Sequence, residues 1–281
     1  MGQNIKSLAA CFCVCFCVSV GILSRWAEHF LGVLNQPTTF DPSVLSELPV
    51  WDTDDGLMRP PDNHEVQRAV NQMSSGKAPG PDGVPPELFK SGSPEIISKL
   101  TTLYESIWSS ETVPQEFKDA LIVHIFKRKG DRSVCDDHRG ISLFSIPGKI
   151  LARVIFNRLV KHVSDNNILL ESQCGFRSGR GTMNMIFTAR QLQEKCREQQ
   201  RELYVVFVDL TKAFDSVDRT ALWEVLLKIG CPPSFVNIIR SFHDGIGMRA
   251  AVVENGEMSV DFDVINGIKQ GCVLSWHRSC S

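Results

Sequence analysis

The sequence predicts a fold that mixes α-helices and β-strands, and three patterns lead to this prediction. Two apolar runs have the length of strands, "ALIVHIF" at 120–126 and "YVVFVD" at 204–209. A segment that begins at Pro147 repeats apolar residues at helical spacing. The pair Asn255-Gly256 is a turn typical of a two-residue β-hairpin. The chain shows no internal repeat, so these elements belong to a mixed α and β fold.

Start and stop signals place the other elements. Residues 37–63 read as a loop, because they hold five prolines and many acids. Ser93 and Pro94 open a helix, and Gly230 follows the end of another helix that Asp218 caps. The predicted helices cover residues 64–73, 94–108, 147–163, 183–200 and 219–229, and the predicted strands cover 120–126, 204–209 and both sides of the 255–256 turn.

Length and composition indicate a globular chain with an uneven charge distribution. The 281 residues, 43% hydrophobic and 22% charged, can bury a sizeable core, and the net charge of −2 excludes a uniformly basic protein. Residues 118–161 carry ten Lys and Arg against four Asp and Glu, whereas residues 28–65 carry one against eight. A basic middle behind an acidic lead-in suits a polyanionic partner. Solvated helix faces would explain the same charges, so charge alone leaves both interpretations open.

The cysteines and the N-terminus bear on the compartment. No CxxC pair has a matching His or Cys pair among the ten cysteines, so no structural zinc site is predicted. Scattered single thiols favour a reducing compartment, and we expect an intracellular protein of the nucleus or cytoplasm. The 16 uncharged residues 8–23 are short for a membrane span and resemble the apolar part of a signal peptide, without a clear cleavage site. A signal or anchor and a fortuitous apolar leader both remain open.

Asp209 is the first candidate for chemistry, because it ends a run that is apolar on both faces. Such a run predicts a central strand that is covered on both sides, with the carboxylate where the sheet opens. Mg²⁺ takes carboxylate and carbonyl oxygens, so Asp209 with the carbonyl of Leu210 could hold it. Capping a helix or pairing with Lys212 would equally explain the acid. Phe214 fits either a core position or the floor of a nucleotide pocket.

Two basic segments are candidates for binding phosphate. The segment "FKRKGDRSVCDDHRG" groups five cations that could neutralise a triphosphate or form a solvated loop: Lys127, Arg128, Lys129, Arg132 and Arg139. The loop "GFRSGRGT" could bring Arg177 and Arg180 to a phosphate chain, but it lacks the spacing of a P-loop. No GxSxG, HExxH or GxGxxG pattern occurs, which gives no support to hydrolase, metalloprotease or dinucleotide-binding functions.

Taken in order, five segments resemble the reverse transcriptase of non-LTR (LINE-type) retrotransposons, over roughly residues 24–275. They are "PGPDGVPPELF" (79–89), "ALIVHIFKRKGDRSVCDDHRGISLFSIPGKILARVIFNRL" (120–159), "ESQCGFRSGRGT" (171–182), "VVFVDLTKAFDSVDR" (205–219) and "NGIKQGCVLS" (266–275). The resemblance implies an α+β fold of the right-hand polymerase type, with fingers and palm. It also implies RNA-templated DNA synthesis by two-metal nucleotidyl transfer, with Mg²⁺ as cofactor and RNA template, DNA primer and dNTP as partners. No protein partner is evident.

The resemblance assigns a role to each matching position. Asp209 would bind metal through its side chain and Leu210 through its carbonyl, and Phe214 would be the steric gate under the sugar. Lys127 and Arg139 would contact the triphosphate, Gln270 the nascent base pair, and Arg177 and Gly179 the template. The implied organisation is an apolar leader over 1–23, an acidic lead-in over 24–73, a fingers-like region over 74–200 and a partial palm over 201–281.

The departures from the family pattern limit the expected activity. His124 stands where the family usually has Pro, and His138 where it usually has Tyr. After residue 275 the family continues into a hairpin with "F/Y-A-D-D", whereas this chain reads "WHRSCS", and no thumb follows. Neither Asp261 and Asp263, on a predicted hairpin edge, nor Asp54-Asp55, in an acidic loop, fits the missing role. We therefore expect this chain alone to be inactive as a polymerase.

Three alternatives follow for the function of the chain. The first is a truncated reverse transcriptase domain with an incomplete palm. The second is a nucleic-acid-binding remnant without catalysis, which would use the basic region 118–201. The third is a membrane-inserted or secreted product led by residues 8–23.

Overall fold

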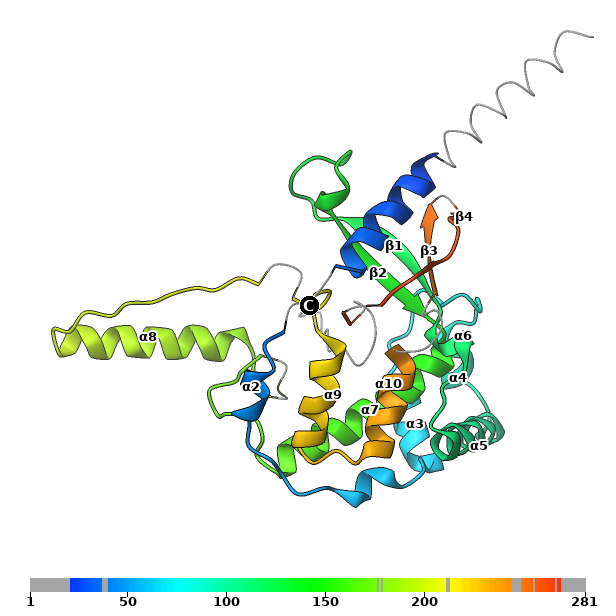
Figure 1. Ribbon diagram of the computed structural model, residues 1–281, viewed down its shortest axis with the longest axis horizontal. Coiled ribbons are helices and arrows are strands. Elements are labelled where there is room, and N and C mark those ends of the chain that lie inside the picture. The colour runs from blue at the N-terminus through cyan, green and yellow to red at the C-terminus, as the bar shows by residue number, and fades with distance from the viewer. Residues whose placement is uncertain are drawn as a thin grey trace, which may run out of the picture.

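The structure is a computed structural model, and it describes residues 21–36, 40–175, 177, 179–210, 213–243, 249–254, 256–265 and 267–268. It is an α+β arrangement in which a small mixed sheet stands above a helical body (Figure 1). The helices are α2 (Ser43–Ser46), α3 (Asn63–Asn71), α4 (Pro86–Lys90), α5 (Pro94–Ser110), α6 (Gln115–Lys118), α7 (Ile146–Asp165), α8 (Thr182–Glu198), α9 (Arg219–Lys228) and α10 (Pro233–His243), with short 3-10 turns η1 (Asp55–Met58) and η2 (Cys135–Asp137). A further helix, here called the N-terminal helix, is described over residues 21–34.

The sheet is built around β1 (Ala120–Phe126), which has a neighbour on each edge. On one side β2 (His138–Phe144) is antiparallel, and on the other side β3 (Arg249–Glu254) is parallel. The short strands β4 (Glu257–Met258) and β5 (Phe262–Asp263) both pair antiparallel with β3. Strand β2 pairs with β1 along its whole length, whereas β3 pairs only with Ala120–Val123, so this first half of β1 has a neighbouring strand on both edges.

The N-terminal helix covers one face of this sheet. Trp26, Phe30 and Leu34 follow one another every fourth residue, so they lie on one side of the helix, where they pack against Ile122 of β1 and neighbouring apolar residues of the sheet region. Phe30 lies so close to Gly140 that a Cβ added there would approach the ring to 2.5 Å. Only glycine at this position of β2 lets the helix approach the sheet so closely.

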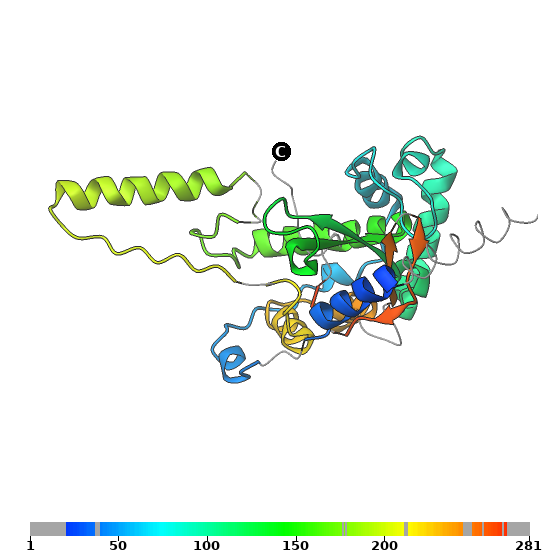
Figure 2. The same ribbon diagram turned by 90° about the horizontal axis from the view of Figure 1, so that it is seen from above.

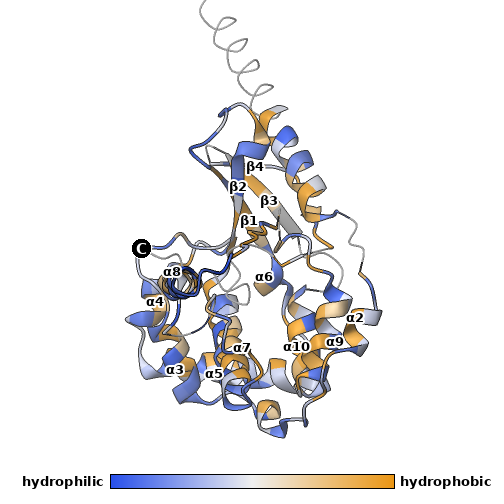
Figure 3. Ribbon diagram, turned by 90° about the vertical axis from the view of Figure 1, so that its left-hand side faces the viewer, coloured by the Kyte–Doolittle hydropathy of each residue, from blue (hydrophilic) through white to orange (hydrophobic). Residues whose placement is uncertain are grey.

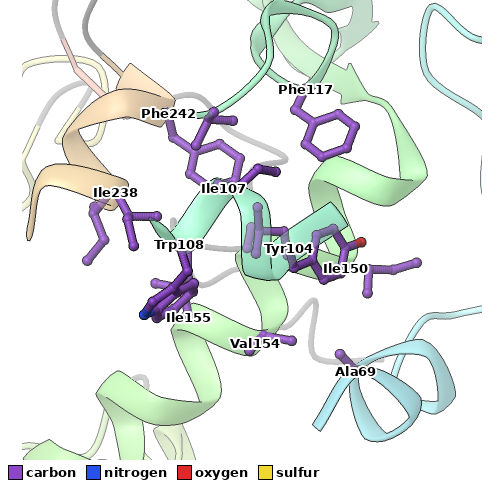
Figure 4. Close-up of a cluster of buried hydrophobic side chains, with 14 of the residues drawn as sticks. Ala69, Tyr104, Ile107, Trp108, Phe117, Ile150, Val154, Ile155, Ile238 and Phe242 are labelled. Atoms are coloured by element: carbon purple, nitrogen blue, oxygen red, sulfur yellow. The ribbon is translucent and has the colours of Figure 1, made fainter. Parts of the chain in front are cut away.

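The main core lies in the helical body, where α3, α5, α7, α9 and α10 turn their apolar sides toward one another (Figure 3). Tyr104 of α5 is completely buried there, and its hydroxyl donates a hydrogen bond of 2.8 Å to the carbonyl of Pro147 (Figure 4). Burial raises the pKa of this hydroxyl far above its ordinary value. The contact fixes α5 against the first turn of α7, which begins at Ile146 behind a Ser145 cap.

A polar cluster ties the acidic lead-in to the body. Arg158 of α7 donates to both carboxylate oxygens of Glu65, at 2.8 and 2.5 Å, and its guanidinium lies 4.9 Å from the Trp108 ring centroid. The buried imidazole of His162 lies within hydrogen-bonding distance of Asp54 Oδ2 and of the Ile229 carbonyl, at 3.1 and 2.6 Å. These contacts hold the segment predicted as a loop against the helices. Within it the structure departs from the prediction in two places, the short helix Ser43–Ser46 and the 3-10 turn Asp55–Met58.

One part of the chain projects from this body. Helix α8 and the extended segment that follows it extend together to one side (Figures 1 and 2), and we call residues 182–210 the arm. Every residue of the arm is exposed except Gln191 and Cys196, which are half-buried. The prediction of a covered strand over 204–209 is therefore wrong for the described structure. The physical reason is that none of the strands in the described residues pairs with this segment.

Most of the other predicted elements are confirmed. The strand 120–126 matches β1, and the helices predicted from Ser93-Pro94, from Pro147 and from Asp218 are α5, α7 and α9. The hairpin around the 255–256 turn is β3 and β4, with Val253 facing Met258. The leader is described only from residue 21 onward, so the predicted signal or anchor lies almost wholly outside the described residues. Within the described part of the chain, no helix is long and apolar enough to cross a membrane.

Candidate functional site

The loop end of the β1–β2 hairpin brings two predicted phosphate ligands together. Arg139 faces Ile125 across the ladder, and Lys127 extends the pairing because its N–H donates a hydrogen bond of 2.8 Å to the Asp137 carbonyl. The ammonium of Lys127 donates to the carbonyl of Asp136 at 2.6 Å. Both basic side chains are exposed, so the hairpin presents two cations to solvent at one place.

The loop between these strands is ordered around a single carboxylate. The N–H of Asp131 donates a hydrogen bond of 2.7 Å to Asp137 Oδ2. Gly130 has a φ of +86°, and a Cβ there would lie 2.1 Å from the same oxygen, so the position requires glycine. The N–H of Ser133 donates to the Asp131 carboxylate and lowers the pKa of that group. The loop therefore has a defined conformation, and its cations Lys127, Arg128, Lys129 and Arg132 are exposed.

Lys127 and Arg139 line a pocket of about 320 Å³ between the hairpin and the N-terminal helix. The helix contributes His29 and Phe30, and the turn before α9 contributes Asp215. The pocket is thus lined by two cations and by two acidic residues, one of which, Asp136, lies on the hairpin with the cations. Asp215 lies in a turn, and the sequence analysis assigned a role neither to it nor to the helix residues. The sequence feature that could have predicted the N-terminal helix is the apolar residue at every fourth position before the loop at 37–63.

The two departures from the family pattern contact each other beneath the N-terminal helix. The rings of His124 and His138 have centroids 5.4 Å apart, because the residues are diagonal neighbours on one face of the hairpin. Trp26 stacks on His124 with a centroid distance of 4.1 Å and an interplanar angle of 9°. Both histidines therefore serve as flat packing surfaces for the helix that forms one wall of the pocket.

The structure does not bring Asp209 and Leu210 to this pocket. Both lie at the exposed end of the arm, and the side chain of Leu210 is 70% exposed. Phe214 is half-buried in the turn that follows, where its carbonyl accepts a hydrogen bond of 2.8 Å from the N–H of Ile268. The motif "DLTKAFD" is thus divided, because its last acid, Asp215, reaches the pocket and its first does not.

The described residues do not by themselves fit a resident metal ion. Asp209 and Leu210 supply one carboxylate and one carbonyl on an exposed segment, whereas two Mg²⁺ ions need several hard oxygen ligands in a fixed geometry. No cluster of three His, Cys, Asp or Glu side chains suited to a metal occurs in the part of the chain that the structure describes.

The predicted template ligands lie in the loop before α8. Arg177 and Arg180 both pair with Glu171, the former at 3.3 Å, so this carboxylate already neutralises part of their charge. Gly179 has a φ of +74°, which glycine adopts without strain. Neither Arg177 nor Gly179 lines the pocket with Lys127 and Arg139. Gln270 lies outside the described residues.

Arg219 is a further buried residue that sequence reasoning missed. Its guanidinium donates hydrogen bonds of 3.1 Å to the Gly267 carbonyl and 2.5 Å to the His243 carbonyl. Gly267 itself donates to the Val217 carbonyl at 3.2 Å. Arg219 thereby joins α9, α10 and the segment after β5 behind the turn that carries Asp215. Nothing in the sequence distinguishes it from an exposed arginine next to a helix cap.

A comparison of the sequence with known protein families tests the family resemblance described above. Residues 126–277, more than half of the chain, match the profile described as "Reverse transcriptase (RNA-dependent DNA polymerase)". The chain belongs to the reverse transcriptase family. The matched residues of this reverse transcriptase include the basic hairpin loop, the arm and the turn with Asp215, whereas the N-terminal helix lies before them.

The relatives of this reverse transcriptase come from non-LTR elements. It is 27% identical over 210 residues to "Probable RNA-directed DNA polymerase from transposon BS" of Drosophila melanogaster, covering 75% of this chain and 23% of that protein. It is 25% identical to the RNA-directed DNA polymerase from mobile element jockey of the same organism, with the same coverage of 75% and 23%. A 115 kDa protein of the type-1 element R1DM, also from Drosophila melanogaster, is 26% identical over 92% of this chain and 24% of its own length. The chain thus spans about a quarter of the length of these relatives.

Proposed function

We propose that this reverse transcriptase domain binds an RNA template, a DNA primer and a dNTP, and that its activity in a complete enzyme is RNA-templated DNA synthesis. The observation that carries the proposal is the meeting of Lys127 and Arg139 in one pocket, within a chain that belongs to the family. Two cations at the mouth of an open pocket suit the phosphate oxygens of a nucleotide. Residues 74–200 act as fingers and residues 201–281 as part of a palm.

The other site residues have separate proposed roles. Phe214 is the steric gate that stacks under the sugar, and Gln270 contacts the nascent base pair. Arg177 and Gly179 follow the template backbone, where Arg177 exchanges its contact with Glu171 for phosphate. The protein works inside the cell, in the nucleus or cytoplasm, where the template is found.

Reverse transcriptases use divalent metal ions, and we propose Mg²⁺ for this one. The Asp209 carboxylate and the Leu210 carbonyl would supply two oxygen ligands, which is too few for a two-metal site. We therefore propose that residues 1–281 alone bind nucleic acid but do not extend a primer, because these oxygen ligands are too few to hold two metal ions.

Primer extension tests the proposal. The chain is incubated with an RNA template, a labelled DNA primer, dNTPs and Mg²⁺, and we expect no extension above background. Robust extension that Asp209→Ala abolishes would contradict the inactivity and would show that the metal site is complete. Extension that Asp209→Ala leaves unchanged would contradict the assignment of Asp209 as a metal ligand.

Binding without catalysis is the part of the proposal that the exposed hairpin cations favour. Affinity for an RNA–DNA template-primer should fall with salt, and Lys127→Gln or Arg139→Gln should each weaken binding about threefold to tenfold and reduce the salt slope by about one. Lys99→Gln is the matched control, because Lys99 is an exposed lysine on α5 that pairs with Glu95, away from the hairpin. Equal effects at all three positions, or no binding at low salt, would contradict the hairpin assignment.

A further inference from the structure

The extended end of the arm has the chemistry of a strand but lacks a neighbouring strand among the described residues. Residues 203–208 are six consecutive apolar residues, and Phe207 is 93% and Val206 83% exposed. Among the described residues, no backbone hydrogen bond reaches residues 202–210. Unpaired N–H and C=O groups along an apolar, β-branched segment form a template for another strand. Helix α8 beside it has no buried residue, so the whole arm is accessible.

A second copy of the same segment is an occupant whose fit can be worked out from the sequence. A parallel in-register pair would place the charges of Arg201, Glu202 and Asp209 beside their own copies, which is unfavourable. An antiparallel pair related by a two-fold axis avoids this repulsion and gives the closed symmetry typical of dimers.

Two-fold symmetry restricts the register. Directly opposed residues in an antiparallel ladder alternate between hydrogen-bonded and non-hydrogen-bonded pairs. If no residue faced its own copy, the two residue pairs on either side of the two-fold axis would be equivalent by symmetry. Because these two pairs are adjacent in the ladder, one would be hydrogen-bonded and the other not, which contradicts that equivalence. One residue must therefore face its own copy, and the middle of the apolar run offers Tyr204, Val205 or Val206.

Charge selects among these three registers. With Val205 at the centre, Arg201 of each copy faces Asp209 of the other, so two opposite-charge pairs close the two ends. With Val206 at the centre, Asp209 faces Leu203 instead. With Tyr204 at the centre, Arg201 faces Phe207.

The Val205 register also matches the side chains between the charges. Leu203 faces Phe207 across the pair, and Tyr204 faces Val206, which are the aromatic–aliphatic pairs that stabilise sheets. Glu202 faces Val208, but its carboxylate already accepts the hydroxyl of Tyr204 within the same copy. Every charge in the segment therefore has a partner of its own.

We propose that two copies of this chain associate through antiparallel pairing of residues 201–209 about Val205, with reciprocal Arg201–Asp209 ion pairs. The interface is independent of the nucleotide pocket and goes beyond the proposed polymerase function. It engages the same carboxylate that would bind Mg²⁺, so the paired form and the metal-bound form exclude each other at Asp209.

Charge exchange tests the register. Sedimentation equilibrium of the 281-residue chain under reducing conditions should show a monomer–dimer equilibrium. Arg201→Asp alone and Asp209→Arg alone should each raise the dimer Kd at least about tenfold (~1.4 kcal/mol), because each creates two like-charge pairs. The double variant R201D/D209R should restore the Kd to within about threefold, because it rebuilds both pairs in reverse. Arg190→Asp, the same charge change elsewhere on the arm, should leave the Kd unchanged.

Other outcomes overturn the proposal. A chain that stays monomeric at every concentration would mean that another segment of the protein covers residues 203–208. A dimer insensitive to both single exchanges would place the contact elsewhere, for example in the apolar N-terminus. Failure of the double exchange to rescue would exclude the Val205 register. Since the readout is association and not primer extension, failure here is distinct from failure of the polymerase proposal.

Discussion

Two apolar segments of this chain, β1 and residues 204–210, have nearly the same composition and opposite environments. In β1, Ile122 is 1% exposed and lies between β2 and β3, under the N-terminal helix. In the arm, Val206 is 83% exposed and no described strand lies beside it. The difference lies in the neighbours and not in the residues. An apolar, β-branched run becomes a strand where other strands satisfy its backbone, and stays an exposed ribbon where they do not.

Matched truncations in the two segments should give the largest contrast. Ile122→Ala removes buried methyl groups and leaves a cavity, so we expect it to lower the free energy of unfolding by about 3 kcal/mol. Val206→Ala removes exposed methyl groups and should change it by less than about 0.5 kcal/mol. Urea unfolding of dilute protein, followed by circular dichroism, measures both. A large loss for Val206→Ala would show that the segment is covered in the folded monomer.

Cysteine reactivity compares the body with the arm directly. Burial, reinforced by the Asp54 carboxylate, raises the pKa of the Cys231 thiol to about 12, whereas Cys196 is half-buried on α8. At pH 8.5 iodoacetamide should modify Cys196 at least about a hundredfold faster than Cys231, because the thiolate is the reactive form. Peptide mapping by mass spectrometry gives both rates, and similar rates would contradict the packing around Cys231.

The same raised pKa fixes the sign of a pH effect on stability. The unfolded chain releases the Cys231 proton near its ordinary value of 9.0, and the folded chain holds it to about 12. The contribution is therefore fully present below about pH 9 and is lost as the pH rises toward 12. Cys231→Ala should flatten the fall in stability over this interval, and Cys196→Ala should leave it unchanged.

Two ion pairs, one in the helical body and one in the loop before the arm, allow the same comparison through smaller changes in stability. Glu65→Gln leaves the Arg158 guanidinium, 11% exposed, without its carboxylate, and we expect a loss of about 2 kcal/mol, because Glu65 is itself partly exposed. Glu171→Gln, in the loop before the arm, acts on a carboxylate that is 77% exposed and should cost less than about 1 kcal/mol. Urea unfolding of both variants measures the difference, and equal losses would mean that the loop is as firmly packed as the body.

The sequence predicted the elements whose signals are local. Pro and Ser at helix starts, Gly230 after α9 and the turn at 255–256 each act on a few neighbouring residues, and these elements formed where they were predicted. That Lys127 and Arg139 lie close together was expected from their place in one basic segment, although the strand β2 that carries Arg139 was not predicted. The roles of these two residues came from the resemblance to the family, because geometry alone would not have distinguished a phosphate-binding hairpin from a solvated basic loop.

Contacts between distant segments were not predictable. The place of the N-terminal helix over the hairpin depends on Trp26 contacting His124 and His138 and on Phe30 meeting a glycine of β2, all more than ninety residues later in the chain. The exposure of residues 204–209 could not be read from their composition, because it depends on which strands lie beside them. Asp215 entered the pocket for a similar reason, since Gly267 and Arg219 hold its turn from elsewhere in the chain.

Hydrogen exchange of the backbone amides is the most direct test of the claim that neighbouring strands decide whether these segments are paired or exposed. At the lowest protein concentration, amides of β1 should be strongly protected, whereas those of residues 203–209 should exchange at nearly unprotected rates. As the concentration rises, protection should appear in residues 203–209 while that of β1 stays constant. Protection of both segments to the same degree at every concentration would contradict the account.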